Sequence, residues 1–283
     1  MTLSGGFTGA AIVAGIAGWP VKHSRSPRIH NYWLQQYGID GVYVPFALAP
    51  ETAIEAIRML PALGIRGMNV TVPNKEKAYK AMDEVDRWAE RLKAVNTIVV
   101  RDGVLHGANT DAFGFLESLR EAQPDWQADA GPVVILGAGG ASRAIVAGLL
   151  DAGAPEIRIA NRTPERSDAI RDEFGSLVRP VPWERRADAL GDATLLVNTT
   201  SLGMEGQPAL EMDLAKLPAT SMVYDIVYVP LETPLLAAAR ARGNPAVDGL
   251  GMLLHQARPG FREWFGTDPV VDQALRDHVL AAL

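Results

Sequence analysis

Polar residues with catalytic potential follow several short apolar runs in the first part of the chain. N-V-T-V-P-N-K (69–75) ends on a lysine, and G-A-N-T-D (107–111) ends on an aspartate. H-S-R-S-P (23–27) adds two hydroxyls, and A-V-N-T (94–97) adds an amide and another hydroxyl. Ligands of open α/β sheets bind outside the carboxyl ends of the strands, so we expect these groups to gather at one edge of a sheet.

Lys75 and Asp111 are the pair best suited to proton transfer. Hydride transfer to a ketone builds negative charge on the oxygen, which a nearby cation stabilises and to which an acid must deliver a proton. A lysine can do both, and a carboxylate beside it would hold the ammonium in place. The alternative is a solvated lysine at the start of one helix and an aspartate that caps the next. For His23 a structural hydrogen bond is expected rather than proton transfer.

A glycine-rich turn in the middle of the chain indicates a dinucleotide site. The apolar run 133–136 leads directly into G-A-G-G-A-S (137–142). Gly137 permits a tight turn, Gly139 lets the backbone approach a pyrophosphate, and the following helix offers N–H groups and the positive end of its dipole. Ser142 stands where the usual pattern has a third glycine or alanine. Glycines also end strands for structural reasons alone, so the turn by itself leaves both interpretations open.

The segment N-R-T-P-E-R (161–166) favours NADP over NAD. An NAD site carries an acidic residue about 20 residues past the glycines, where it binds the ribose 2′-hydroxyl. Here Arg162 and Arg166 could bind a 2′-phosphate through forked hydrogen bonds, with Asn161 and Thr163 beside them. The alternative is that both arginines are solvated residues at the start of a helix.

Composition and charge narrow the class of protein. The 283 residues are 48% hydrophobic and 21% charged with a net charge of −6, which is typical of a globular protein and leaves no basic face for nucleic acid. Cysteine is absent, which excludes disulfides and thiolate chemistry, and the five histidines show no metal-ligand spacing. The N-terminus lacks a basic region, and no apolar stretch reaches the roughly 18 residues of a membrane span. We therefore expect no signal peptide, no metal, no membrane partner and a cytoplasmic location.

Apolar periodicity predicts alternating strands and helices up to Asp111. The expected strands are 10–17, 41–48, 67–72, 95–101 and 104–107, and the expected helices are 26–37, 50–63 and 75–82. Ser26 is the expected N-cap of the first helix, with Pro27 as its first residue. Asp102–Gly103 predicts a hairpin. The sheet should therefore be mostly parallel, with one antiparallel insertion.

The alternation restarts after Asp111. Strands are expected at 133–136, 157–160, 195–198, 222–226 and 246–247, and helices at 113–122, after the glycine turn to residue 150, and at 164–174 and 234–242. Two last helices, 252–265 and 270–283, have no strand left to cover and should return to the first domain. The expected fold class is α/β with two domains and a cleft between them. Residues 1–111 and 248–283 form the substrate-binding catalytic domain, and residues 112–247 form a Rossmann-like NADP-binding domain.

The motifs and their order resemble those of shikimate dehydrogenases. They run from Gly18 to Ala257, so the resemblance covers nearly the whole chain. The matching segments are G-W-P-V-K-H-S-R-S-P, G-M-N-V-T-V-P-N-K-E, A-V-N-T, G-A-N-T-D, G-A-G-G-A-S, N-R-T-x-x-R, Y-D-I-V-Y-x-P-x-x-T-P-L-L and D-G-L-G-M-L-L-H-Q-A.

This resemblance implies reversible reduction of 3-dehydroshikimate to shikimate by hydride from NADPH, in the pathway to chorismate and the aromatic amino acids. It implies Lys75 and Asp111 as the catalytic pair. The implied substrate residues are Ser24 and Ser26 for the carboxylate, Thr71, Asn96 and Gln256 for the ring hydroxyls, and Tyr228 for a further contact. The implied cofactor residues are Gly137, Ala138, Gly139, Gly140, Ala141, Asn161, Arg162, Thr163, Arg166 and Gly249.

Asn74 departs from the family pattern, because many members carry an aromatic residue or histidine before the lysine. An asparagine there is similar to members that also accept quinate, so one alternative is a broader quinate/shikimate dehydrogenase with NAD as a possible cofactor. Such an enzyme would carry an acid at the end of strand 157–160, and none is present. A second alternative, a non-catalytic NADP-binding regulator, should have lost Lys75 or Asp111, and both remain. The family includes monomers and homodimers, and either state fits.

Overall fold

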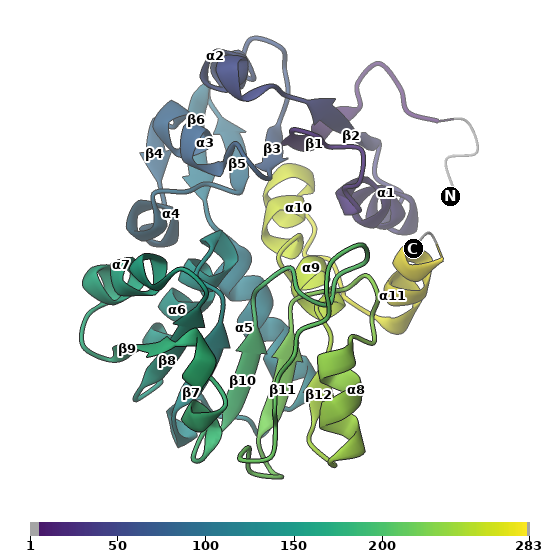
Figure 1. Cartoon of the computed structure of the whole chain (residues 1–283). Coiled ribbons are helices and arrows are strands. Elements are labelled where there is room, and N and C mark those ends of the chain that lie inside the picture. Colours follow the sequence, from purple (N-terminus) through teal and green to yellow (C-terminus); the bar gives the residue numbers. More distant parts are fainter. Residues whose placement is uncertain (1–5, 282–283) are drawn as a thin grey trace. The chain divides into compact units, whose positions relative to one another are not determined.

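The structure is a computed structural model that describes residues 6–281. The chain forms two compact units, a first unit of the described residues up to Thr110 and from Leu254 onward, and a second unit of Asp111–Leu253. Figure 1 shows one sheet in each unit. The signal-peptide expectation concerns a stretch whose first residues, Met1–Gly5, lie outside the described part, as do the last two residues of the expected C-terminal helix. None of the described helices is long and apolar enough to cross a membrane.

The sheet of the first unit has the strand order β2-β1-β3-β5-β6-β4. Its strands are β1 (Ile12–Gly18), β2 (Gly41–Ala47), β3 (Gly67–Val70), β4 (Glu84–Val85), β5 (Thr97–Arg101) and β6 (Val104–Ala108). β1 pairs in parallel with β2 and β3, whereas β5 runs antiparallel to β3 and β6. Asp102 and Gly103 turn the β5–β6 hairpin with φ values of 51° and 81°. The expected parallel sheet with one antiparallel insertion is confirmed.

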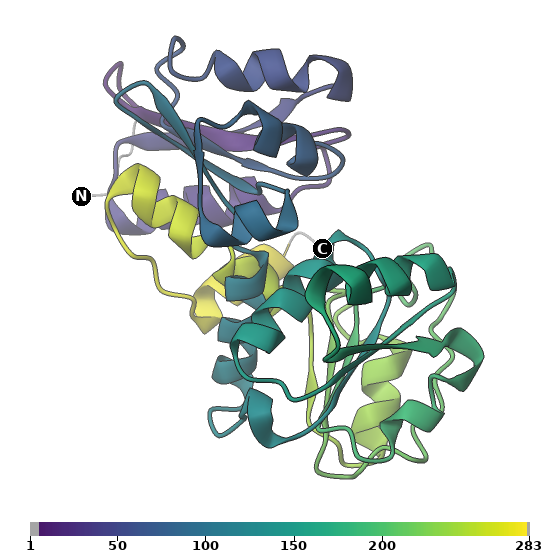
Figure 2. The same ribbon diagram turned by 90° about the vertical axis from the view of Figure 1, so that its left-hand side faces the viewer.

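Helices cover both faces of this sheet. On one face α2 (Ala53–Arg58), α3 (Lys75–Ala81) and α4 (Arg87–Leu92) bury apolar side chains against the strands. On the other face lie α1 (Ser26–Tyr37) and α10 (Arg258–Phe265), and Figure 2 shows blue α2 above the strands and yellow α10 below them. Trp264 of α10 donates its indole N–H to the Ile98 carbonyl at 2.9 Å. A Cβ atom at Gly67 would lie 2.1 Å from the same indole nitrogen, so this packing requires glycine.

The second unit holds a fully parallel sheet in the order β12-β11-β10-β7-β8-β9. Its strands are β7 (Val133–Leu136), β8 (Ile157–Asn161), β9 (Val178–Pro182), β10 (Leu195–Asn198), β11 (Met222–Asp225) and β12 (Ala246–Val247). Its helices include α5 (Asp111–Ala122), α6 (Gly140–Asp151), α7 (Pro164–Phe174) and α8 (Pro234–Ala241). With β7 as its first strand, this is the 3-2-1-4-5-6 order of a Rossmann fold. The central strands β7, β10 and β11 are buried on both faces, and the expected α/β class is confirmed.

Three expected helices are wrong in extent, and proline explains one of them. The expected helix 50–63 is a 3₁₀ turn at Pro50–Thr52 followed by α2, which ends at Arg58. Pro61 has no N–H to donate and disfavours helical backbone at the residue before it. The expected helix 252–265 is divided at residues 256–257 into α9 (Leu250–His255) and α10, and Pro259 lies in the first turn of α10, where its missing N–H leaves no helical hydrogen bond unmade. The last helix, α11 (Gln273–Leu280), begins later than expected because Asp272 caps it, accepting the Leu275 N–H at 2.8 Å.

Other elements differ from the sequence prediction as well. Ser26 is the first residue of α1 rather than its N-cap, a place that Arg25 takes. The short elements β4 and α4 and the strand β9 have no counterpart in the prediction. β9 contains Pro180 and Pro182, which argue against a strand in sequence but are tolerated in one at the edge of a sheet.

His30 of α1 lies in the aromatic core of the first unit. Its ring stacks on Tyr43 with centroids 4.0 Å apart and planes 9° from parallel, and it is fully buried. Burial lowers the pKa of His30 from 6.5 to about 3. The folded protein therefore holds this histidine neutral at pH values where the unfolded chain protonates it.

We expect this histidine to make the protein less stable in mild acid. Between about pH 6.5 and pH 4 the unfolded state binds a proton at His30 that the folded state does not, so the free energy of unfolding falls as pH falls. Wild type should lose about 1 kcal/mol per pH unit more than His30→Phe over this range, in urea titrations of both proteins. At pH 8 the imidazole is neutral in both the folded and the unfolded state. The difference in the free energy of unfolding between wild type and His30→Phe at this pH therefore gives the effect of packing alone. Equal pH slopes for the two proteins would contradict the buried neutral histidine.

Candidate active site

The predicted substrate residues of the first unit adjoin strands that end or begin at one edge of its sheet. β1 and β3 end together because they run in parallel, with Ala17 opposite Val70. β5 runs in the other direction, so its first residue, Thr97, lies at this edge, opposite Asn69 on one side and Ala108 on the other. The predicted residues next to these strand ends in the chain are Ser24, Ser26, Thr71, Lys75 and Asn96.

Ser24 and Ser26 are fixed where the loop after β1 enters α1. The Ser26 N–H donates to Ser24 Oγ at 3.3 Å, and the Ser24 N–H donates to the Val21 carbonyl at 3.0 Å. Ser26 is buried and Ser24 is half-buried. The Ser24 hydroxyl thus accepts a helix-start N–H, as a cap does, and holds the two serines close together.

Lys75 is the first residue of α3, and several bonds hold this helix start. Its carbonyl accepts the Val95 N–H at 2.9 Å. Asn74 is fully buried and donates through Nδ2 to the Leu48 carbonyl at 2.8 Å, while Lys77 Nζ donates to the Pro50 carbonyl at 2.6 Å. Asn74 therefore ties α3 to the loop after β2, which gives this departure from the family pattern a structural reason.

Asn96 joins the A-V-N-T and G-A-N-T-D motifs. Its Oδ1 accepts the backbone N–H of Thr110 at 2.9 Å. The Thr110 hydroxyl donates in turn to the Gln256 carbonyl at 2.8 Å, just past the end of α9. Asp111 follows Thr110 directly as the first residue of α5 and is 9% exposed. The chain connectivity alone therefore brings the predicted catalytic carboxylate next to a fixed residue of the substrate half.

In the second unit the glycine turn joins β7 to α6. Gly137 has a φ of 102°, and a Cβ there would lie 2.6 Å from Thr199 Oγ1, so only glycine fits. Gly139 is the N-cap of α6, and Gly140 is its first residue. Ser142 is buried and donates its hydroxyl to the Gly137 carbonyl at 2.8 Å. This bond is a function for the serine that the glycine pattern does not predict, and the helix start remains suited to a pyrophosphate.

Asn161–Arg166 lies beside that turn, at the end of β8. β7 and β8 run in parallel with Leu136 opposite Ala160, so both segments leave the sheet at the same edge. Asn161 Nδ2 donates to the Thr163 carbonyl at 2.8 Å, while Arg162 and Arg166 are exposed. Asn161 and Arg162 line a surface groove that Trp183 also lines. Cationic side chains at this edge, one strand from the glycine turn, lie where a ribose 2′-phosphate would be bound.

A buried carboxylate organises the loops after β10 and β11. Asp225 accepts the Asn198 amide at 2.9 Å, the Val227 N–H at 3.0 Å and the Thr233 hydroxyl at 2.7 Å. Burial raises the pKa of Asp225, and its three donors oppose that rise. The loop held in this way carries Tyr228.

Gly249 lies against this loop, because its N–H donates to the Val227 carbonyl at 3.2 Å. A Cβ at Gly249 would lie 2.1 Å from the Ile226 carbonyl oxygen. A glycine is therefore required here for the close approach of two backbones, at the same edge of the sheet as the glycine turn.

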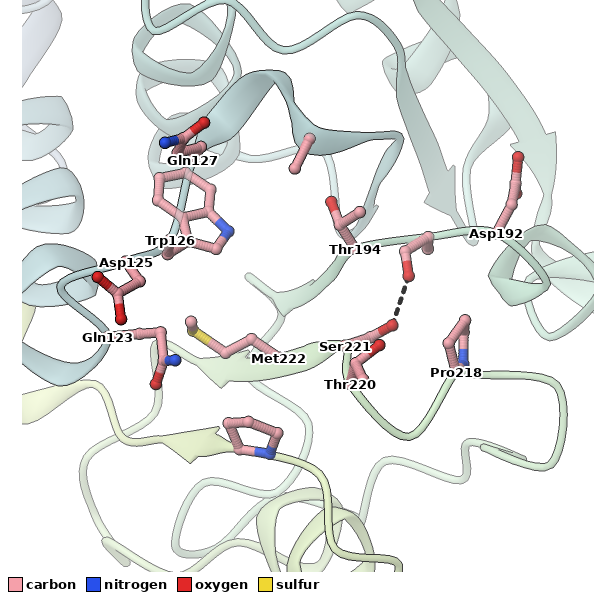
Figure 3. Close-up of a pocket in the computed structure, with 13 residues that line it drawn as sticks. Gln123, Asp125, Trp126, Gln127, Asp192, Thr194, Pro218, Thr220, Ser221 and Met222 are labelled. Carbon is pink, nitrogen blue, oxygen red and sulfur yellow. Dashed lines mark hydrogen bonds between the residues drawn. The ribbon is translucent and has the colours of Figure 1, made fainter.

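A second groove on this unit, of about 850 Å³ including its open mouth, contains none of the predicted site residues (Figure 3). Trp126 lies on one side of it and Met222 and Thr220 lie on another. Ser221, which also lines the groove, donates to the Ala193 carbonyl at 2.6 Å. These segments precede β10 and β11, so the groove is at the opposite edge of the sheet from the glycine turn, away from the strand ends that bind nucleotides.

Two family models match the chain. The shikimate dehydrogenase substrate binding domain matches residues 16–98, and shikimate / quinate 5-dehydrogenase matches residues 120–225. A curated shikimate dehydrogenase (NADP(+)) from Paramagnetospirillum magneticum is 58% identical over 275 residues, which is 97% of this chain and 100% of the relative.

Solved structures agree with these matches. Shikimate 5-dehydrogenase from Thermus thermophilus, in complex with NADP(H) and shikimate, superimposes with a TM-score of 0.85 at 37% identity, covering 96% of this chain and 100% of that one. Quinate dehydrogenase from Corynebacterium glutamicum, in complex with NAD, has a TM-score of 0.87 at 32% identity, covering 96% of this chain and 99% of that one. The strand-end motifs, both family models and a relative at 58% identity agree, and the chain belongs to the shikimate dehydrogenase family.

Proposed function

We propose that this chain is an NADP-dependent shikimate dehydrogenase that reversibly reduces 3-dehydroshikimate to shikimate, on the route to chorismate and the aromatic amino acids. The observation that carries the proposal is that β1, β3 and β5 meet at one edge of the first sheet, and both serines, Lys75 and Asn96 belong to segments adjoining these strand ends. The relatives that share nearly the full length of the chain bear the name shikimate dehydrogenase (NADP(+)).

Lys75 and Asp111 perform the proton transfer in this proposal. NADPH, when bound, supplies the hydride. The Lys75 ammonium lies by the ketone oxygen, stabilises the negative charge that develops there and donates a proton to it. Asp111 accepts a hydrogen bond from the ammonium and orients it. In the reverse direction neutral Lys75 takes the proton from the shikimate hydroxyl.

The remaining residues of the first unit bind and orient the ring acid. Ser24 and Ser26 donate hydroxyl protons to the carboxylate. Thr71, Asn96 and the Gln256 side chain bind ring hydroxyls, and Tyr228 adds a further contact.

The second unit holds the cofactor in this proposal. The backbone of Gly137, Ala138, Gly139, Gly140 and Ala141 binds the pyrophosphate at the start of α6. Arg162 and Arg166 bind the 2′-phosphate, with Asn161 and Thr163 beside it, and Gly249 lets the backbone lie close to the cofactor. A cytoplasmic location and a monomeric or homodimeric state complete the proposal, and cell fractionation and sedimentation test them.

Substrate and cofactor choice can be tested in one set of assays. Wild type should oxidise shikimate with NADP at a kcat/KM roughly 100-fold above that with NAD, because the proposal assigns two arginines to the 2′-phosphate. Quinate is the substrate to compare, since a quinate dehydrogenase with NAD is among the similar structures. Equal rates with quinate and NAD would favour the broader enzyme. Cofactor binding without turnover of either acid would favour a non-catalytic regulator.

The 2′-phosphate assignment predicts an effect that is confined to NADP. Changing Arg162 and Arg166 to Ala should raise KM for NADP by roughly tenfold to a hundredfold for each guanidinium that no longer binds the phosphate, and leave KM for NAD unchanged. Arg240→Ala, an exposed arginine of α8 that pairs with Glu232 at 2.7 Å, is the control and should change neither KM. A double variant that still prefers NADP would show that other groups bind the phosphate.

Lys75 and Asp111 should behave as one catalytic unit. Lys75→Ala should lower kcat on the order of 10²–10³-fold and still bind shikimate in a calorimeter, because the charge it stabilises exists mainly in the transition state. Asp111→Asn should behave similarly, and the double variant should be little worse than either one. Lys80→Ala, an exposed lysine on the same helix, is the control. Near-normal kcat with a raised KM in Lys75→Ala would make this lysine a binding residue only.

A further inference from the structure

A chain of buried polar side chains lies behind the predicted substrate residues and has no role in the chemistry proposed above. It consists of Tyr43 on β2, Asn69 on β3 and Thr97 on β5, and none of the three is more than 3% exposed. Buried polar groups lower stability unless they are hydrogen-bonded, so each hydrogen bond in this chain constrains the side chains that make it.

A backbone carbonyl fixes the orientation of Asn69. Its Nδ2 donates to the Asn96 carbonyl at 3.1 Å, and a carbonyl can only accept. The same amide nitrogen donates to Thr97 Oγ1 at 3.1 Å. Asn69 Oδ1 therefore faces the opposite way, where the Tyr43 hydroxyl donates to it at 2.6 Å.

A backbone N–H fixes the orientation of Asn96 in the same manner. Asn96 Oδ1 accepts the Thr110 N–H at 2.9 Å, and this group can only donate. The Thr97 hydroxyl, which accepts from Asn69, uses its single proton to donate to the same Oδ1 at 3.0 Å. Because internal donors hold the amide oxygen of Asn96, its amide nitrogen is the side with which it can approach a ligand.

The other end of this chain of buried side chains is fixed through the backbone of Tyr43. The Tyr43 backbone is bound in both directions by Asn31, which accepts the Tyr43 N–H at 3.0 Å and donates to its carbonyl at 2.8 Å. Burial raises the pKa of Tyr43 well above its ordinary value. Tyr43 therefore remains a protonated donor to Asn69.

We propose that Tyr43, Asn69 and Thr97 are positioning residues that make Asn96 present its amide N–H groups, and not its oxygen, to the substrate. The site then recognises a ring oxygen that accepts a hydrogen bond at this position. The inference rests on the proposed function, because it needs Asn96 to contact the ring acid. The inference adds three residues that influence substrate recognition without contacting the substrate.

Thr97→Val is the direct test, because valine keeps the shape of threonine and removes the hydroxyl. Asn96 then loses one of the donors to its oxygen, and Asn69 loses an acceptor. KM for shikimate should rise roughly tenfold while KM for NADP stays unchanged. Thr97→Ser, which restores the hydroxyl, should return KM for shikimate to the wild-type value. A merely structural hydroxyl would lower the melting temperature and leave both KM values unchanged.

Tyr43→Phe tests the Tyr43 end of this chain of buried side chains and is compared with a matched control variant. It removes the donor to Asn69, and KM for shikimate should rise as in Thr97→Val. The control is Tyr224→Phe, since Tyr224 is also fully buried and donates to Ser118 Oγ at 2.9 Å in the core of the second unit. Tyr224→Phe should lower the melting temperature without changing KM for shikimate.

The outcomes separate this inference from the proposed function. Wild type is assayed first, and a wild type that does not oxidise shikimate with NADP overturns the proposed function and this inference with it. An active wild type whose Thr97→Val variant keeps its KM for shikimate overturns the inference alone. Should Thr97→Val fail to fold, Tyr43→Phe decides in its place. A KM for shikimate that rises equally in Tyr43→Phe and Tyr224→Phe also overturns it.

Discussion

Parallel strand pairing decides where the polar groups of this protein can lie. A parallel strand packed on both faces is mostly apolar, so most of the polar residues that belong to it come at its end or just before or after it. β1 and β3 end at one edge of the first sheet, and β7, β8, β10 and β11 end at one edge of the second. Every predicted site residue lies next to such an edge or on an adjoining segment. The strand order determines which motifs become neighbours. Short loops are then enough to hold their polar residues at the shared edge.

The fold could be predicted because its determinants are local. Apolar runs, the Asp102–Gly103 hairpin and the turn at Gly137 are each visible within a few residues of sequence. The end of α2 and the start of α10 were also available in principle, because Pro61 and Pro259 mark them. β9 was not, since its prolines are acceptable only at the edge of a sheet, a position that depends on the whole strand order.

Of the candidate site, only the residues expected to contact the substrate could be predicted from sequence, and the buried residues behind them could not. Lys75, Asn96 and the serines occur in motifs that can be recognised in sequence. The bond from Asn69 to Thr97 depends on the antiparallel register of β3 and β5, which joins residues 28 positions apart. Ser24 rather than Ser26 accepts the N–H at the start of α1 because of the local course of the loop. A residue pattern carries no information on which end of a buried amide faces the ligand, since that follows from the backbone groups around it.

The edge strand β9 has a consequence for how the molecule meets other chains. Alternate residues of a strand direct their N–H groups to the same side, so Pro180 and Pro182 remove two donors from one side of β9. β8 pairs with β9 on its inner side, and Figure 1 shows β9 at the margin of its sheet. An extended peptide that approached this margin would find carbonyls without the matching donors and could not continue the ladder. The second sheet is in this way protected at β9 against the edge-to-edge growth that leads to aggregation.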